Sequence, residues 1–126
     1  MITSSKQLNK KTGNQGELIA IDHLLHNNKG FFLLERNFSC KIGEIDIIMQ
    51  CADQIIFIEV KARTSLLYGQ PYESITKPKM AKIRRVAEYY VMKNKLWKAN
   101  VRFDVVSILI DKIHGNHAIE HLVAAF

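Results

Sequence analysis

The segment GEIDIIMQCADQIIFIEVKAR, residues 43–63, contains two β-forming runs that are both interrupted by charged residues. Residues 43–51 and 54–62 are rich in isoleucine, and Ala52-Asp53 between them predicts a two-residue turn. Because side chains alternate across a strand, Glu59 and Lys61 share a face with the apolar Phe57. The segment therefore predicts a hairpin that is buried near its turn and opens into a charged site at its other end.

The turn sets which residues of this hairpin face each other. A two-residue turn places Ile48 opposite Phe57, Asp46 opposite Glu59 and Glu44 opposite Lys61, all on one face. That face would carry Glu44, Asp46 and Ile48 of the first strand, and the other face Ile45, Ile47 and Met49. Directly opposed carboxylates destabilise a sheet, and a bound Mg²⁺ or Mn²⁺ offsets their repulsion. The pattern predicts a metal site. The alternative is a charge network without metal, in which the two acids pair with Lys61, Arg63 or Arg36.

Periodicity on either side of the hairpin predicts a mixed α/β domain. A helix is expected over residues 14–28, with an apolar stripe of Leu18, Ile21, Leu24 and Leu25. A strand over residues 31–39 completes an antiparallel meander with the hairpin. A second helix is expected from Lys77 to about Leu96, with Met80, Ile83, Ala87, Tyr90 and Val91 as its stripe. Residues 101–110 and 118–123 predict two further strands, and residues 1–12 a loose arm before one domain over residues 13–126.

Composition and charge indicate which binding partners and which cellular location to expect. Lys and Arg number 18 against 12 Asp and Glu, so the net charge of +6 favours polyanionic partners. The two cysteines lack C-x-x-C spacing and the N-terminal residues contain no apolar signal region, so we expect a cytoplasmic protein. No apolar run approaches the length of a membrane span, so no membrane partner is expected.

Basic residues gather on the outer face of the second predicted helix and just before it. They would follow a phosphate backbone without reading sequence. Tyr68 and Tyr72 would stack on unpaired bases or simply cover the core. The predicted nucleic-acid contacts are Arg63, Lys77, Lys79, Lys82 and Arg85.

Four further polar or charged residues are candidates for the site, each with a simpler interpretation. Glu17 lies beside the apolar stripe of the first helix, so it is either a third acid of the site or an acid favoured by the helix N-terminus. For the secondary candidates Glu44, Gln70 and Lys79 we favour simple roles, with Glu44 pairing across the strands with Lys61 and Lys79 solvated.

Two other groups of residues are not expected to belong to the site: one pair is structural, and the histidines are not expected to bind zinc. Arg102 and Asp104 share a strand face and predict an ion pair. Zinc is not favoured, because neither His23 and His26 nor the histidines at 114, 117 and 121 come with cysteine at zinc-finger spacing.

The order of these motifs resembles the YraN-like family of the PD-(D/E)xK nuclease superfamily. The resemblance covers about residues 13–110 and rests on Gly13-x-x-Gly16-Glu17-x-x-Ala20, Arg36-Asn37, Gly43-Glu44-Ile45-Asp46, Phe57-Ile58-Glu59-Val60-Lys61-x-Arg63, Gly69-x-Pro71, the helix bearing Lys79, and Arg102-Phe103-Asp104-Val105-Val106. It implies a restriction-endonuclease-like core similar to that of Holliday-junction resolvases, with a central mixed sheet flanked by helices.

The same resemblance implies roles for individual residues. Asp46, Glu59 and the Val60 carbonyl would bind Mg²⁺ or Mn²⁺, Lys61 would lie beside the attacking water, and Glu17 would be an accessory acid. The implied function is metal-dependent hydrolysis of phosphodiester bonds in structured or branched DNA, which is favoured over RNA, and the two-fold symmetry of a junction suggests a homodimer. The alternatives are a non-catalytic nucleic-acid-binding module and a protein-interaction or assembly factor.

Overall fold

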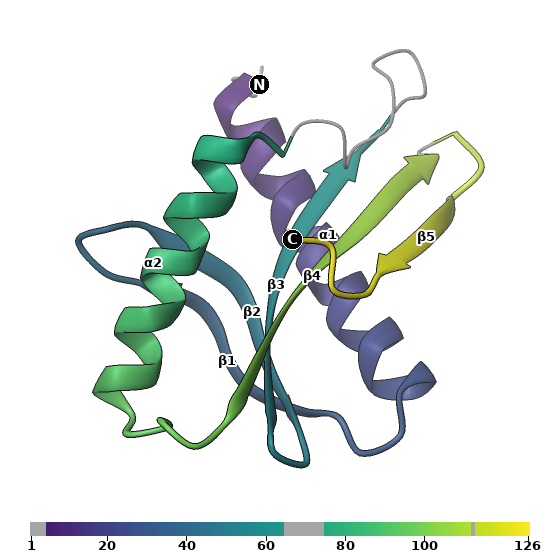
Figure 1. The fold of residues 1–126 in the computed structure, drawn as a ribbon. Helices are drawn as coiled ribbons and strands as arrows, with labels where there is room; N and C mark the ends of the chain where they lie inside the picture. The colour runs from purple at the N-terminus through teal and green to yellow at the C-terminus, as the bar shows by residue number, and fades with distance from the viewer. Residues whose placement is uncertain (1–4, 65–74, 112) are drawn as a thin grey trace.

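A five-stranded mixed sheet forms the middle layer of the computed structural model, which describes residues 5–64, 75–111 and 113–126. Helices α1, Ser5–Asn27, and α2, Lys77–Lys93, lie on its two faces (Figure 1). The strands lie in the order β1 to β5, and their bounds are Phe32–Ser39, Glu44–Cys51, Gln54–Arg63, Asn100–Asp111 and Asn116–Leu122. The predicted α/β class, with a mixed sheet flanked by helices, is confirmed.

Strands β1, β2 and β3 form the predicted antiparallel meander. The turn at Ala52-Asp53 gives the predicted register, with Cys51 paired to Gln54 and Ile48 to Phe57. Ala52 has a φ of 54°, the positive value that type I′ and II′ hairpin turns have at their first central position. β3 and β4 run parallel, since helix α2 carries the chain back across the sheet, and β5 returns antiparallel to β4.

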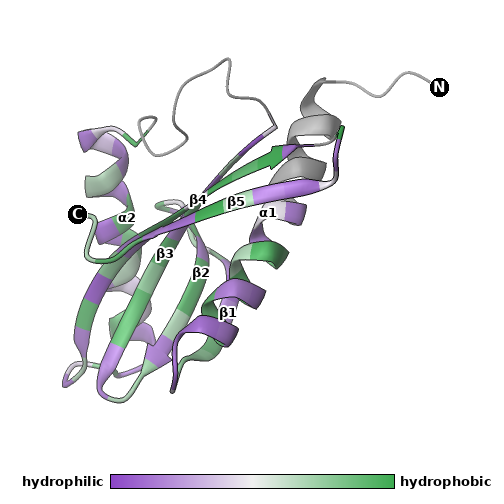
Figure 2. Cartoon of the chain, turned by 90° about the vertical axis from the view of Figure 1, so that its right-hand side faces the viewer, coloured by the Kyte–Doolittle hydropathy of each residue, from purple (hydrophilic) through white to green (hydrophobic). Residues whose placement is uncertain are grey.

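Each face of the sheet packs against one helix and has its own core. Under α2, a cluster that includes Ile48, Phe57, Ile83 and Tyr90 is buried. Under α1, a second cluster includes Ala20, Leu24, Ile47, Met49, Ile56 and Ile58. Figure 2 shows green, hydrophobic colour along the strands between the two helices. Residues 55 to 58 alternate between these two cores, so the predicted change of face at every residue of β3 is confirmed there.

Helix α1 differs from its prediction in start and in buried face. It begins at Ser5, so residues 5–12 belong to the helix and are not a loose arm. Straight-chain lysine, glutamine and leucine, without proline, favour helix even where no apolar period marks it. The predicted stripe is wrong at Leu18 and Leu25, which are 56% and 41% exposed. Among residues 15–27, the buried positions are Gly16, Glu17, Ala20 and Leu24.

The small residues of this face bring α1 close to β3. A Cβ atom built on Gly16 would lie 2.6 Å from the Cβ of Ala62, closer than real carbon contacts allow. Gly16 is therefore required for the distance between helix and strand, although glycine inside a helix costs about 1 kcal/mol relative to alanine.

Replacing Gly16 by alanine should destabilise the protein by about 1–3 kcal/mol, because the steric cost exceeds the gain in helix propensity. Urea denaturation monitored by circular dichroism measures the change. The double variant Gly16→Ala with Ala62→Gly removes the clash and should recover most of the loss. If Gly16→Ala alone were as stable as the wild type, the close approach of α1 to β3 would be contradicted.

Neither described helix combines the length and the hydropathy that a membrane span requires.

Candidate active site

Strands β2 and β3 separate at the end opposite their turn, and Asp46 lies at that point. The recorded pairs run from Cys51 and Gln54 to Ile47 and Ile58, so Asp46 is the first residue beyond the ladder. In a continued ladder Val60 would face Ile45. Instead, the Val60 N–H donates to Oδ2 of Asp46 at 2.8 Å. The Asp46 side chain thus serves as the hydrogen-bond acceptor at the open end of the hairpin.

The separation corrects the predicted faces of β2. Ile45 packs in the core under α2 together with Ile48, whereas Ile47 packs under α1. The prediction that Ile45 shares a face with Ile47 and Met49 is therefore wrong, because strict alternation fails around Asp46. On the neighbouring strand β1, Asn37 has a φ of 56°, which interrupts regular β geometry one position from Phe38, the partner of Ile45.

Glu59 lies beyond Phe57 on the α2 side of β3, and only 7% of it is exposed. Its Oε1 is 3.1 Å from Nζ of Lys79 and 3.5 Å from Nζ of Lys61. Lys79 is thus not the solvated helix residue that we favoured from the sequence. The favoured Glu44–Lys61 pair is also not found, because Lys61 contacts Glu59, and Glu44 accepts a hydrogen bond from Ser39 at 3.5 Å.

The two acids of the hairpin interact unfavourably. Burial, followed by the nearby charge of Glu59, raises the pKa of Asp46 from 3.8 to about 7, against the opposing hydrogen bond from Val60. Burial also lowers the pKa of Lys61, and the adjacent Lys79 contributes in the same direction. The surroundings therefore disfavour the charged form of Asp46, and a cation bound next to this carboxylate would stabilise it.

Glu17 faces the sheet from the middle of α1. Its Oε2 is 3.5 Å from Nη2 of Arg36, and in its favourable orientation the Asn37 amide donates to both carboxylate oxygens, at 2.7 and 3.1 Å. Burial raises the pKa of Glu17 although Arg36 and Asn37 oppose the change. The interpretation of Glu17 as an acid at a helix N-terminus is wrong, because α1 begins at Ser5.

The chemistry of the donors fits a hard divalent cation. Asp46, Glu59 and the Val60 carbonyl would supply oxygen ligands, which Mg²⁺ and Mn²⁺ prefer, and waters would complete the coordination. In the described part of the chain, no three His, Cys, Asp or Glu side chains lie close enough together to hold a metal ion. Glu17 is thus not part of a preformed ligand cluster with the other two acids.

The remaining predicted residues surround this end of the sheet or fall outside the described ranges. Arg63 ends β3 and is half-buried, whereas Lys77, Lys82 and Arg85 are exposed on α2. In Figure 1 the end of β3 and the beginning of α2 point towards the same end of the molecule. Gln70, Tyr68 and Tyr72, with the Gly69-x-Pro71 motif, lie outside the described residues.

Asp104 belongs to a separate, structural cluster. It is fully buried, and Arg102 donates to both of its oxygens, at 2.9 and 2.8 Å, which confirms the predicted ion pair. Nε2 of His121 and the Ala124 N–H also contact it, at 2.7 and 2.9 Å.

The five histidines lie in three places. His114 lies 2.7 Å from Asp111, His121 contacts Asp104, and His117 lines a pocket with His23 and His26. The zinc interpretation therefore gains no three-ligand cluster among residues that the structure describes.

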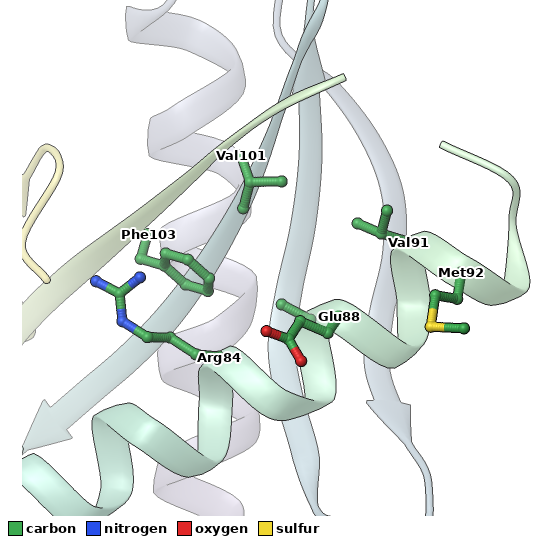
Figure 3. A pocket seen from close by; sticks show the side chains of 7 residues that line it. Arg84, Glu88, Val91, Met92, Val101 and Phe103 are labelled. Carbon is green, nitrogen blue, oxygen red and sulfur yellow. The ribbon is translucent and has the colours of Figure 1, made fainter. Parts of the chain in front are cut away.

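A pocket of about 410 Å³ lies elsewhere, between the C-terminal half of α2 and the beginning of β4 (Figure 3). It is mostly apolar, and the Arg84 guanidinium lies 4.7 Å from the centre of the Phe103 ring. No predicted site residue lines this pocket, so it is separate from the site of the two acids.

Comparison with known proteins identifies the family. The model of the uncharacterised protein family UPF0102 matches residues 16–108, which include Glu17, Asp46, Glu59, Lys61 and Lys79. The chain belongs to the UPF0102 family. This is the YraN-like family that the sequence motifs resemble. UPF0102 proteins of Clostridium kluyveri and Clostridium tetani are 47% and 43% identical to it, each over 94% of this chain and 95% of the relative.

Solved structures similar to this UPF0102 chain are more distant. A chain described in "Structure of EndoMS-dsDNA2 complex" has a TM-score of 0.38 and 20% identity, covering 73% of this chain and 34% of that one. Pyrococcus furiosus SfsA in complex with Ca²⁺ has a TM-score of 0.40 and 14% identity, covering 90% of this chain and 64% of that one.

Lys79 and the Arg36–Asn37 pair are the contacts that sequence reasoning missed. The first turn of α2 contains Lys77 and Lys79 but no acid, although the positive end of a helix disfavours cations. A lysine in that position indicates an acidic partner elsewhere in the fold. For Asn37, the signal is that asparagine adopts left-handed backbone more readily than most residues.

Proposed function

We propose that this UPF0102 protein is a Mg²⁺- or Mn²⁺-dependent endonuclease that hydrolyses phosphodiester bonds in structured or branched DNA. The observation that carries the proposal is the crowding of Asp46 and Glu59 where β2 and β3 separate, with the Lys61 ammonium beside them. A hard divalent cation bound between two such carboxylates would relieve the repulsion between them.

Each residue of the site would have a separate role in such a reaction. Asp46, Glu59 and the Val60 carbonyl would hold the cation, which supplies positive charge at the scissile phosphate and lowers the pKa of the attacking water. The lowered pKa of Lys61 makes it suited to hold or accept a proton at Nζ, close to that water. Glu17, held by Arg36, would orient groups from the α1 side.

The charged surface next to the site supports a nucleic-acid substrate. Lys77, Lys82 and Arg85 are exposed on α2, and Arg63 ends the strand that carries Glu59. Side chains of this kind neutralise phosphates, and each neutralised phosphate makes binding more sensitive to salt. They carry no sequence information, which agrees with a protein that would recognise the shape of DNA.

Cleavage assays test the proposal. The protein with Mg²⁺ or Mn²⁺ is incubated with labelled duplex, single-stranded, flap and four-way-junction DNA, and the Asp46→Ala and Glu59→Ala variants serve as controls. We expect cleavage of the branched substrates, reduced about a thousandfold or more in either variant, because removal of a ligand removes the cation. Wild-type cleavage no greater than that of both variants would overturn the proposal.

One observation favours a second candidate, a non-catalytic nucleic-acid-binding module. Glu59 already contacts Lys61, one of the partners in the metal-free charge network that the sequence left open, and Lys79, which that network did not include. This candidate would bind DNA without metal, equally well with Glu59→Ala, and would lose binding when Lys82 and Arg85 are reversed to glutamate. The endonuclease would lose its cleavage activity in EDTA or with Glu59→Ala, whereas neither change would reduce DNA binding by the non-catalytic module.

A further inference from the structure

One carboxylate oxygen of the site contacts two ammonium groups from different parts of the fold. Oε1 of Glu59 is 3.1 Å from Nζ of Lys79 on α2 and 3.5 Å from Nζ of Lys61, two residues further along β3. An oxygen held by two cations has little negative charge left for a third. A divalent cation that binds Glu59 therefore competes with these lysines for its negative charge.

The two lysines are held differently. The Lys61 side chain is 19% exposed and extends from the same strand as Glu59, whereas the Lys79 side chain is 39% exposed and reaches across from α2. Lys79 also sits in the first turn of its helix, where the helix dipole disfavours a positive charge. Its contact with Glu59 offsets that disadvantage, so Lys79 is the lysine that leaves when the charge of Glu59 is neutralised by another cation.

The surface beside Lys79 offers its ammonium group another set of partners. Lys82 follows one turn later on α2, and its Cε lies 3.1 Å from where a Cβ on Gly43 would be, next to the strand that carries Asp46. Lys82 and Arg85 are exposed on the helix. A released Lys79 would extend this row of positive charges at the edge of the site, where a phosphate of bound DNA would lie.

We propose that Lys79 is an internal counterion that occupies Glu59 when no metal is bound, is displaced when a divalent cation enters, and then binds a phosphate of the nucleic acid. The proposal rests on the proposed function for its metal and its substrate. It assigns Lys79 two opposite effects: it competes with the metal and it favours the nucleic acid.

Calorimetric titration with Mn²⁺ tests the first effect. Lys79→Met should bind Mn²⁺ about three- to tenfold more tightly than the wild type, because the competing ammonium group is gone. Lys82→Met removes the same charge one turn away without touching Glu59, so its Mn²⁺ affinity should change by less than about twofold. Without metal, Lys79→Met should unfold at a lower temperature than the wild type, and Mn²⁺ should raise that temperature by more than it does in the wild type.

Binding of a labelled four-way-junction DNA in the presence of Ca²⁺ tests the second effect. Lys79→Met should bind the DNA several-fold more weakly, with a smaller dependence on salt, despite its higher affinity for the metal. A merely structural lysine would not change the two affinities in opposite directions. Lys79→Gln, which keeps a polar group of similar length, provides a second folded variant.

The outcomes separate this inference from the proposed function. If the wild type binds Mn²⁺ but Lys79→Met binds it no more tightly, the counterion role is overturned and the metal site stands. If only Lys79→Met binds Mn²⁺, the counterion role is supported in its strongest form. If neither protein binds Mn²⁺, both proposals are overturned.

Discussion

Replacing Asp46 by asparagine should make the metal-free protein more stable at neutral and alkaline pH, by about 2 kcal/mol. The folded protein raises the pKa of this carboxyl from 3.8 to about 7, because the group is buried and close to Glu59 and Glu17. Between these pH values the folded state keeps a proton that the unfolded state releases, so stability falls as the pH rises through this window and stays low above it. A shift of about three units corresponds to about 4 kcal/mol at most. Asparagine removes the charge and still offers an oxygen to the Val60 N–H.

Urea denaturation in EDTA at several pH values measures this effect. The wild type should lose stability between about pH 4 and pH 7, whereas Asp46→Asn should lose much less. Asp22→Asn, a change of an exposed aspartate on α1, should follow the wild type. Mg²⁺ should stabilise the wild type and have little effect on Asp46→Asn. A wild type whose stability is flat over this range would contradict the predicted repulsion.

Replacing Asp104 by alanine should destabilise the protein by about 3–5 kcal/mol, the largest stability loss that we expect. Asp104 is fully buried, and its oxygens accept hydrogen bonds from Arg102, His121 and the Ala124 N–H. Burial raises the pKa of this carboxyl, but these hydrogen bonds together hold it below its usual value. Alanine would leave the Arg102 side chain, which is 19% exposed, without its partner and would remove the acceptor of the Ala124 N–H.

Two variants serve as comparisons for Asp104→Ala in thermal or urea denaturation. Asp111→Ala removes an aspartate from the same strand that also pairs with a histidine, but at the surface, and should have a much smaller effect. Changing Arg102 to methionine together with Asp104 to leucine removes both charges and should recover part of the loss. Equal losses for Asp104→Ala and Asp111→Ala would show that the buried cluster adds no stability.

The hairpin was predictable because its signals are local. Two β-forming runs and a short turn fix the register of Ile48 against Phe57, and alternation then places Glu59 and Lys61 on one face. The alternation failed at Ile45, where β2 separates from β3 and the Asp46 side chain accepts the Val60 hydrogen bond. Periodicity assumes a regular strand, so it does not detect an irregularity that depends on the neighbouring chain.

The contacts between distant elements were less predictable. Lys79 and Glu59 are brought together by the packing of α2 on the sheet, and no local pattern encodes their distance. The buried face of α1 was mispredicted because large apolar residues were given more weight than small ones. Gly16 and Ala20 allow close approach to β3, while Leu18 points outward. Small residues at i, i+4 spacing were the available signal.

The two separate cores have a consequence for how this protein can be damaged. The layer under α1 holds Glu17 in place, whereas the layer under α2 holds Lys79, and strands β2, β3 and β4 contribute side chains to both. A mutation that loosens the packing of one helix would therefore displace only one of these two charged side chains, the acid for α1 or the lysine for α2, and leave the other in place. Mutations in the hydrophobic interior would fall into two classes with opposite effects on the charge of the site, according to which of the two cores they affect.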